Sequence, residues 1–208
     1  MVDTRVEVQV LFDAYLWIGV AVAVIVFGAV GFAAIRYRRR PGREPSRRSD
    51  WMRGELAYVG VLVLIVAGLV TATFTTEDQV DAVSDDPALK IDVMAFQWGW
   101  TWTYPDGVSV TGNSDAPPTF AVPTDRTVRF RLRSRDVIHA FWIPDQRFKR
   151  DAFPNRTTEF DLDFDHAGMN GGVCAEFCGL RHSRMSFNVL ALPEPDFRSW
   201  LADRGGRP

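Results

Sequence analysis

Two long, uncharged runs of apolar residues dominate the first third of this 208-residue chain. The first covers residues 14–35 (AYLWIGVAVAVIVFGAVGFAAI), and the second covers residues 56–74 (LAYVGVLVLIVAGLVTATF). At 1.5 Å per helical residue they would reach roughly 33 and 28 Å, close to the ~30 Å thickness of a bilayer's hydrocarbon core. We therefore predict that residues 1–74 form a hairpin of two transmembrane helices.

The segment between the two runs indicates how the hairpin is oriented. Residues 36–55 hold eight arginines against Glu44, Asp50 and Glu55. Because positively charged loops remain in the cytoplasm, we expect the N-terminus and everything after residue 74 to lie outside the cell membrane. A cleaved signal peptide is the alternative for the first run. It is disfavoured because no positive excess precedes the run and an arginine cluster follows it.

After the second run the composition becomes polar and rich in turn-forming residues. Residues 75–90 (TTEDQVDAVSDDPALK) are acidic and lack periodicity, so they are predicted to be a linker. Residues 91–208 then form the extracytoplasmic domain. Period-two alternation is clearest in TVRFRLR and TEFDLDFD, which predicts β-strands. At least half a dozen such segments predict an antiparallel sandwich or small barrel, and residues 195–204 (PDFRSWLADR) predict a short terminal helix.

An aromatic stretch opens the predicted domain. If residues 91–104 form one strand, five aromatic side chains project from one face: Phe96, Trp98, Trp100, Trp102 and Tyr104. Core packing explains most of them. Three tryptophans within five residues exceed what a small core needs, which leaves open a role in conducting electrons or meeting a partner.

A short segment near the C-terminus concentrates soft metal ligands. Cys174, Cys178, His182 and Met185 lie four, four and three residues apart. Thiolate, imidazole and thioether together favour copper over zinc, because zinc sites seldom use methionine. A disulfide between the two cysteines, a structural zinc site and a loop without metal remain as alternatives.

An upstream histidine completes a possible ligand set. His139 lies in a predicted strand beside Trp142 and Pro144. The loop of residues 174–185 lacks one ligand, which favours His139 as a further metal ligand. His166, in the predicted turn DFDHAGMNGG, is better explained as an exposed loop residue. A mononuclear blue-copper site uses one cysteine, so the second cysteine favours a two-copper centre.

These segments together resemble subunit II of the haem-copper oxidases of the cytochrome c oxidase type. The segments that carry the resemblance are, in order, FQWGWTWTYP, DVIHAFWIP, RFKRDAFPNR and CAEFCGLRHSRM. The resemblance implies a cupredoxin-like sandwich with a binuclear copper centre, CuA. It also implies the copper ligands, which are the side chains of His139, Cys174, Cys178, His182 and Met185 and the backbone carbonyl of Glu176.

The resemblance extends to function and partners. It implies that Trp98 accepts electrons from cytochrome c or a small copper protein, and that haem in subunit I receives them for oxygen reduction coupled to proton pumping. It also implies a magnesium or manganese site at the border with subunit I, using the Glu176 carboxylate. The chain has three histidines, too few for haem and copper as well, so the oxygen-reducing site is expected in another subunit.

The net charge of the predicted domain indicates which partners it favours. Residues 77–208 carry 20 acids and 15 basic residues, a net charge near −5, which would favour a basic electron donor. The arginines lie in the membrane loop or alternate along strands, so no nucleic-acid partner is expected.

A CuA-containing nitric oxide reductase and a membrane-anchored copper chaperone remain as alternative functions.

Overall fold

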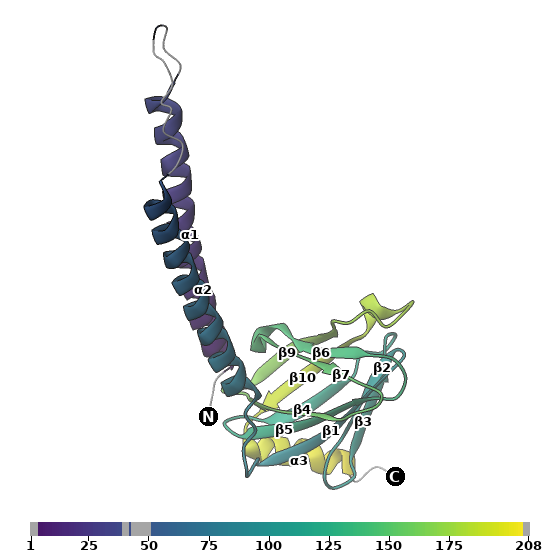
Figure 1. Ribbon diagram of the computed structural model, residues 1–208. Coiled ribbons are helices and arrows are strands. Elements are labelled where there is room, and N and C mark those ends of the chain that lie inside the picture. The colour runs from purple at the N-terminus through teal and green to yellow at the C-terminus, as the bar shows by residue number, and fades with distance from the viewer. Residues whose placement is uncertain (1–3, 39–41, 43–50, 206–208) are drawn as a thin grey trace. The chain divides into compact units, whose positions relative to one another are not determined.

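A computed structural model describes residues 4–38, 42 and 51–205 (Figure 1). Within these residues the chain forms three α-helices, ten β-strands and two short 3-10 helices. Contacts divide it into a helical unit, Val6–Asp78, and a β-rich unit that contains the residues from Gln79 onward together with the start of the chain up to Arg5. Five arginines of the predicted cytoplasmic loop, at positions 39, 40, 43, 47 and 48, lie outside the described residues.

The helical unit consists of α1 (Thr4–Arg36) and α2 (Met52–Asp81). Neither helix has a buried residue, although both are apolar around their whole circumference. Helices of this kind need an apolar surround, and both are long and apolar enough to cross a membrane. Within this unit, the Tyr15 hydroxyl lies 2.8 Å from the Thr73 hydroxyl.

Both helices extend beyond the apolar runs that predict them. Helix α1 spans Thr4–Arg36 where residues 14–35 were expected, and α2 continues past residue 74 to Asp81. The predicted linker over residues 75–90 is therefore wrong in its first half and last residues, because β1 already begins at Leu89. The segment TTEDQVD contains no glycine or proline, so an established helix can propagate through it at little cost.

The β-rich unit is a sandwich of two five-stranded sheets (Figure 1). One sheet has the order β3-β2-β1-β5-β8, and the other has the order β4-β10-β9-β6-β7. The strands are β1 (Leu89–Phe96), β2 (Gly99–Thr103), β3 (Ser109–Asn113), β4 (Thr119–Pro123), β5 (Thr127–Ser134), β6 (His139–Ile143), β7 (Phe148–Ala152), β8 (Thr158–Asp163), β9 (Gly168–Cys174) and β10 (Ser186–Leu192). Two pairs, β1–β5 and β4–β10, are parallel, so the expectation of a purely antiparallel sandwich is wrong.

The alternating segments form the core as predicted. Val128, Phe130 and Leu132 of β5 are buried, and Arg131 and Arg133 on the opposite face are exposed, whereas Arg129 on that face is buried. Rings from both sheets meet at the centre, where Phe130 lies 5.3 Å from Phe160 and 5.7 Å from Phe141 between ring centroids. Each fully buried phenylalanine stabilises the fold by about 1.5–3 kcal/mol.

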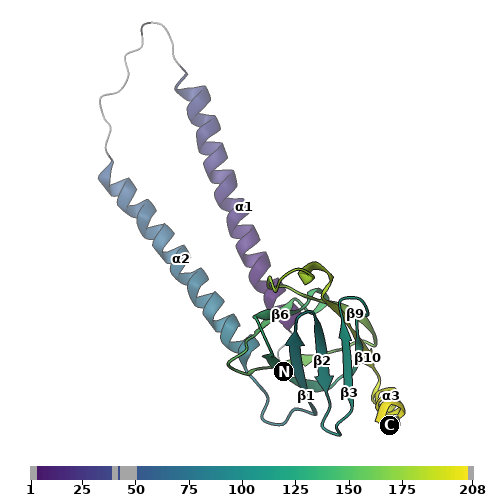
Figure 2. The same cartoon turned by 90° about the vertical axis from the view of Figure 1, so that its right-hand side faces the viewer.

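The aromatic stretch is not a single strand. Strands β1 and β2 form a hairpin that turns at Gln97–Trp98, with Phe96 paired to Gly99 (Figure 2). The turn reverses the chain, so Phe96 faces outward under Arg135 while Trp100 is fully buried. The prediction of one continuous face therefore fails, because strand alternation does not continue through a turn and Gln-Trp carries no usual turn signal.

A glycine-rich segment expected as a turn forms strand β9 instead. A Cβ atom on Gly172 would lie 2.0 Å from the Phe187 ring on the neighbouring strand. The glycine here makes room for a core ring rather than for a tight turn. This placement is decisive for the site, because β9 ends at Cys174. The predicted C-terminal helix is present as α3 (Glu194–Gly205).

Candidate metal centre

The soft ligands come from separate elements that meet at one end of the sandwich. His139 begins β6 and Cys174 ends the neighbouring strand β9. The chain then loops through Cys178 and a short 3-10 helix, η2 (His182–Arg184), before Met185 leads into β10. This loop lies at one end of the sandwich in Figure 1. Two adjacent antiparallel strands thus hold His139 and Cys174 in place at one end of the sheet.

The donor atoms form a closed cluster around the two cysteines. The sulfurs of Cys174 and Cys178 lie 3.8 Å apart. His139 places Nδ1 3.8 Å from the Cys174 sulfur, and His182 places Nδ1 3.7 Å from the Cys178 sulfur. The Met185 sulfur lies 3.7 Å from the Cys178 sulfur. Each thiol therefore has one imidazole beside it.

Glu176 meets this cluster through its backbone. The Cys174 thiol donates to the Glu176 carbonyl oxygen at 3.3 Å. The cysteines are free, which contradicts the disulfide alternative. His166 is exposed in the segment between β8 and β9, as expected. All five predicted side-chain ligands and the Glu176 carbonyl are thus within one cluster.

The cluster is largely shielded from water. His139 is completely buried, and Met185, Cys174 and Cys178 are 5% exposed or less. Trp100 stands on the core side with its ring centroid 6.2 Å from that of His139. His182 is partly exposed, with Phe177 edge-on to it at 5.8 Å. The site is therefore dry on the core side and reaches solvent through His182.

Asp136 orients His139 from outside the cluster. Nε2 of His139 donates to the Asp136 carboxylate at 2.8 Å, which leaves the Nδ1 lone pair directed at Cys174. Burial opposes the charged forms of both groups. For His139, the contacts with Cys174 and Asp136 outweigh burial and raise its pKa. For Asp136, the contact with His139 and the N–H groups of Gln97 and Val137 outweigh burial and lower its pKa.

Asp136 was not predicted from the sequence. Its position three residues before a candidate ligand, in DVIH, was the available signal.

The two thiols compete for ionisation. Burial raises the pKa of the Cys178 thiol, and the adjacent Cys174 sulfur raises it further. For Cys174, burial is outweighed by its contact with His139 and by the backbone N–H of Ala140, so its pKa is lowered. Two thiolates this close are stable together only with a compensating cation, which is the behaviour of a metal site.

Trp98 reaches the cluster from the β1–β2 turn. Its indole Nε1 donates to the Cys178 carbonyl at 3.1 Å, and the Gln97 side chain donates to the same oxygen at 2.8 Å. Gly179 permits this approach: its φ is +112°, and a Cβ there would lie 3.2 Å from the Gln97 amide nitrogen. Trp98 is partly exposed, so one side chain links solvent to a cysteine's backbone.

Comparison with known proteins identifies the family. Residues 114–192 match the family model for the periplasmic domain of cytochrome c oxidase subunit II. A probable cytochrome c oxidase subunit 2 of Streptomyces avermitilis is 30% identical over 235 residues, which cover 90% of this chain and 73% of that protein. The chain belongs to the cytochrome c oxidase subunit II family.

Other subunit II proteins agree with this assignment. The probable subunit 2 of Rickettsia prowazekii is 27% identical over 90% of this chain, and the match spans 64% of that relative's length. The crystallised periplasmic domain of subunit II of the Bradyrhizobium japonicum cytochrome oxidase is 28% identical, with a TM-score of 0.54 over 59% of this chain and 96% of that one. The sandwich is thus the cupredoxin-like domain of subunit II.

A second solved structure contains the same domain in a different state. It is a mixed disulfide between a thioredoxin-like protein and subunit II of a cytochrome c oxidase, 27% identical with a TM-score of 0.51 over 59% of this chain and 94% of that one. In that relative, subunit II forms a disulfide with another protein. In the present subunit II chain, the two cysteines are free and buried.

Proposed function

We propose that this chain is the electron-accepting subunit of a cytochrome c oxidase and that it carries a binuclear copper centre, CuA. The convergence of two thiols, two imidazoles, a thioether and a carbonyl within one buried cluster carries the proposal. In this function the donor is cytochrome c or a small copper protein. Haem in subunit I receives the electrons for reduction of oxygen to water, coupled to proton pumping.

The donors in the cluster fit two coppers. The ligands would be His139, Cys174, Glu176 through its carbonyl, Cys178, His182 and Met185. Soft sulfur and imidazole donors select copper, and two neighbouring thiols can serve both metals. When bound, such a pair shares one electron between its metals and changes little in geometry on reduction.

The protein supplies the rigidity and the dry surround. Asp136 holds His139 in the tautomer that presents Nδ1, and neighbouring backbone N–H groups fix Asp136 in turn. Trp100, Phe141 and Phe187 pack beneath the site with centroid separations of 4.7–5.9 Å. Ligands fixed by a close-packed core need little reorganisation during electron transfer.

Trp98 is proposed as the residue that receives electrons. It is partly exposed, and a single hydrogen bond joins its indole to the backbone of Cys178. We expect Trp98→Phe to slow reduction by cytochrome c about tenfold, because the hydrogen-bonded contact is lost. Trp142→Phe is the matched control, since Trp142 lies on β6 and is 38% exposed. Equal stopped-flow rates for both variants and the wild type would argue against this role.

Glu176 is proposed to serve two metals. Its carbonyl faces Cys174, which leaves the carboxylate free for a magnesium or manganese ion at the border with subunit I. We expect Glu176→Gln to lower the manganese content of the isolated complex several-fold, because carboxylate ligands are charged and amides are not. Copper content should remain unchanged. Metal analysis showing full manganese occupancy would rule the role out.

The proposed function includes a membrane topology for this chain. Helices α1 and α2 cross the cell membrane, and the N-terminus and the β-rich unit lie outside the cytoplasm. A reporter fused at residue 42, in the arginine-rich loop, should be active only in its cytoplasmic form. Activity of a periplasmic reporter at that position would reverse the orientation.

The function is tested on the complex isolated through an affinity tag on this chain. We expect haem to copurify, copper to be present at two atoms per chain, and reduced cytochrome c to drive oxygen consumption. A complex that consumes nitric oxide but no oxygen would support a nitric oxide reductase. Absence of haem, together with copper that is released to a competing apo-protein, would support a chaperone.

A further inference from the structure

The charges of the β-rich unit are divided between its two ends. Strand directions place five connecting segments at the end that holds the metal cluster: residues 97–98, 114–118, 135–138, 153–157 and 175–185. These segments carry four arginines and three acids. The segments at the opposite end are residues 82–88, 104–108, 124–126, 144–147 and 164–167, and they carry two arginines and six acids. The acidic surplus of this unit therefore lies away from the site.

Two of the three acids at this end are compensated, and the third, Glu176, has the carboxylate proposed above for magnesium or manganese. Asp136 is bound to His139 and to the backbone N–H of Gln97, and its carboxylate is only partly exposed. Asp115 is paired with Arg181 and lies 3.5 Å from Arg184. One carboxylate thus faces two guanidinium groups, which leaves a positive excess beside the ligand loop.

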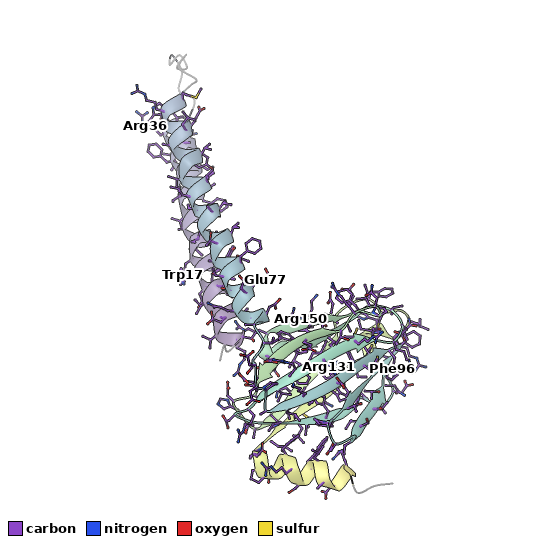
Figure 3. All side chains as sticks on the ribbon, turned by 60° about the horizontal axis from the view of Figure 1, so that its bottom comes forward. Trp17, Arg36, Glu77, Phe96, Arg131 and Arg150 are labelled. Atoms are coloured by element: carbon purple, nitrogen blue, oxygen red, sulfur yellow. The ribbon has the colours of Figure 1, made fainter. Side chains whose placement is uncertain are left out.

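Arginines lie on both sides of the turn that holds Trp98. Ser114 donates its backbone N–H to the Trp98 carbonyl at 2.8 Å, which places the Asp115 pair directly beside the β1–β2 turn. On the other side, Arg135 lies over the Phe96 ring at 4.9 Å, one residue before that turn. In Figure 3, Phe96 lies near this end of the sandwich and Arg131 lies closer to its middle.

An apolar side chain is exposed beside these charges. Leu180 is 90% exposed, and it follows Gly179, whose backbone lies against the Trp98 ring. We define the Trp98 face by these residues: Trp98, Leu180, Asp115, Arg135, Arg181 and Arg184. An apolar centre over a redox site with charges at its rim is suited to brief, electrostatically guided docking.

We infer that the Trp98 face docks an electron donor whose own docking surface is acidic. The inference rests on the proposed function, and it replaces the expectation of a basic donor drawn from the net charge of residues 77–208. Net charge acts over long distances, but its effect is screened beyond about 8–10 Å at physiological salt. The charges on the segments next to Trp98 therefore decide the orientation and rate of docking, and arginines outnumber acids there.

The test measures reduction of the copper-loaded full-length chain in neutral detergent by stopped flow. The probes are a basic cytochrome c and the same cytochrome with its lysines succinylated, which is acidic. Each ferrous haem gives one electron to the oxidised centre. We expect the bimolecular rate with the acidic probe to fall about tenfold as salt is raised from low to physiological strength, since screening weakens the attraction.

Charge variants sharpen the test because they act in opposite directions. With the acidic probe at low salt, Arg181→Gln combined with Arg184→Gln should lower the rate several-fold, and Asp115→Asn should raise it. Asp106→Asn changes the net charge as Asp115→Asn does, but it lies in a turn at the opposite end and should change the rate little. The copper absorbance spectrum of each variant confirms that the ligand cluster is intact.

The outcomes separate this inference from the proposed function. A rate with the acidic probe that rises with salt, or equal effects of Asp115→Asn and Asp106→Asn, would overturn the acidic donor while leaving the copper centre in place. A chain that binds no copper, and so shows no reducible centre with dithionite, would overturn the proposed function and the inference together.

Discussion

Replacing Cys178 with serine is expected to leave the chain with one bound copper instead of two. The Cys178 sulfur lies within 3.8 Å of the Cys174, His182 and Met185 donors, so it contacts three other members of the cluster. A hydroxyl binds copper poorly compared with a thiolate. Without it, His182 and Met185 lose the sulfur that connects them to the rest of the cluster.

The measurement is copper stoichiometry together with electron paramagnetic resonance of the full-length chain. The wild type should show a purple colour and a multi-line signal shared by two copper nuclei, and Cys178→Ser should show the simpler signal of one copper. Ser183→Ala, between His182 and Arg184 in η2, is the control and should keep the wild-type spectrum. A two-copper signal in Cys178→Ser would show that this sulfur is not needed to hold the second copper.

Removing one partner of the Arg129–Asp161 pair is expected to lower the free energy of unfolding by about 3 kcal/mol. Nε of Arg129 lies 2.7 Å from Asp161, a second nitrogen lies 3.0 Å from the same carboxylate, and both side chains are close to 10% exposed. The pair also binds both backbone groups of Ser84, in the segment that leads from α2 to β1. Asp161→Ala leaves an almost buried guanidinium without its carboxylate.

The neighbouring arginine of β5 provides a matched control. Arg131 contacts Asp92 at 3.0 Å and Glu159 at 3.2 Å, but its side chain is 47% exposed. Exposed pairs contribute about 0–1 kcal/mol, so Glu159→Ala should change stability little. Denaturant unfolding of the full chain in detergent, followed by tryptophan fluorescence, compares the two variants. A loss below about 1 kcal/mol for Asp161→Ala would show that water compensates the unpaired arginine.

The ligand set could be predicted because copper coordination restricts residue types and spacing. Cys174, Cys178, His182 and Met185 lie in one short loop, where sequence distance limits spatial distance. His139 required an additional argument, and the structure brings it to 3.8 Å from Cys174. Asp136 escaped prediction because an aspartate before a strand is common, and only the folded ring orientation distinguishes it.

The strand assignments were correct where side chains alternate and failed where glycines or turns interrupt. The alternation in β5 and β8 follows directly from one buried face. Strand β9 was missed because its glycines are typical of a turn, whereas Gly172 makes room for the Phe187 ring of the neighbouring strand β10. The β1–β2 turn was missed because its residues are stabilised by contacts with Cys178 rather than by intrinsic turn preference.

The sequence by itself determined two apolar helices, a β-rich unit and a set of soft metal ligands, because hydropathy, alternation and donor chemistry are properties of residue types. The tertiary structure decided which residues surround those ligands and where the charges lie. Electrostatic attraction depends on distance in space. The surplus of acids in residues 77–208 therefore says little about docking, whereas three arginines gathered around Trp98 by separate loops indicate an acidic partner.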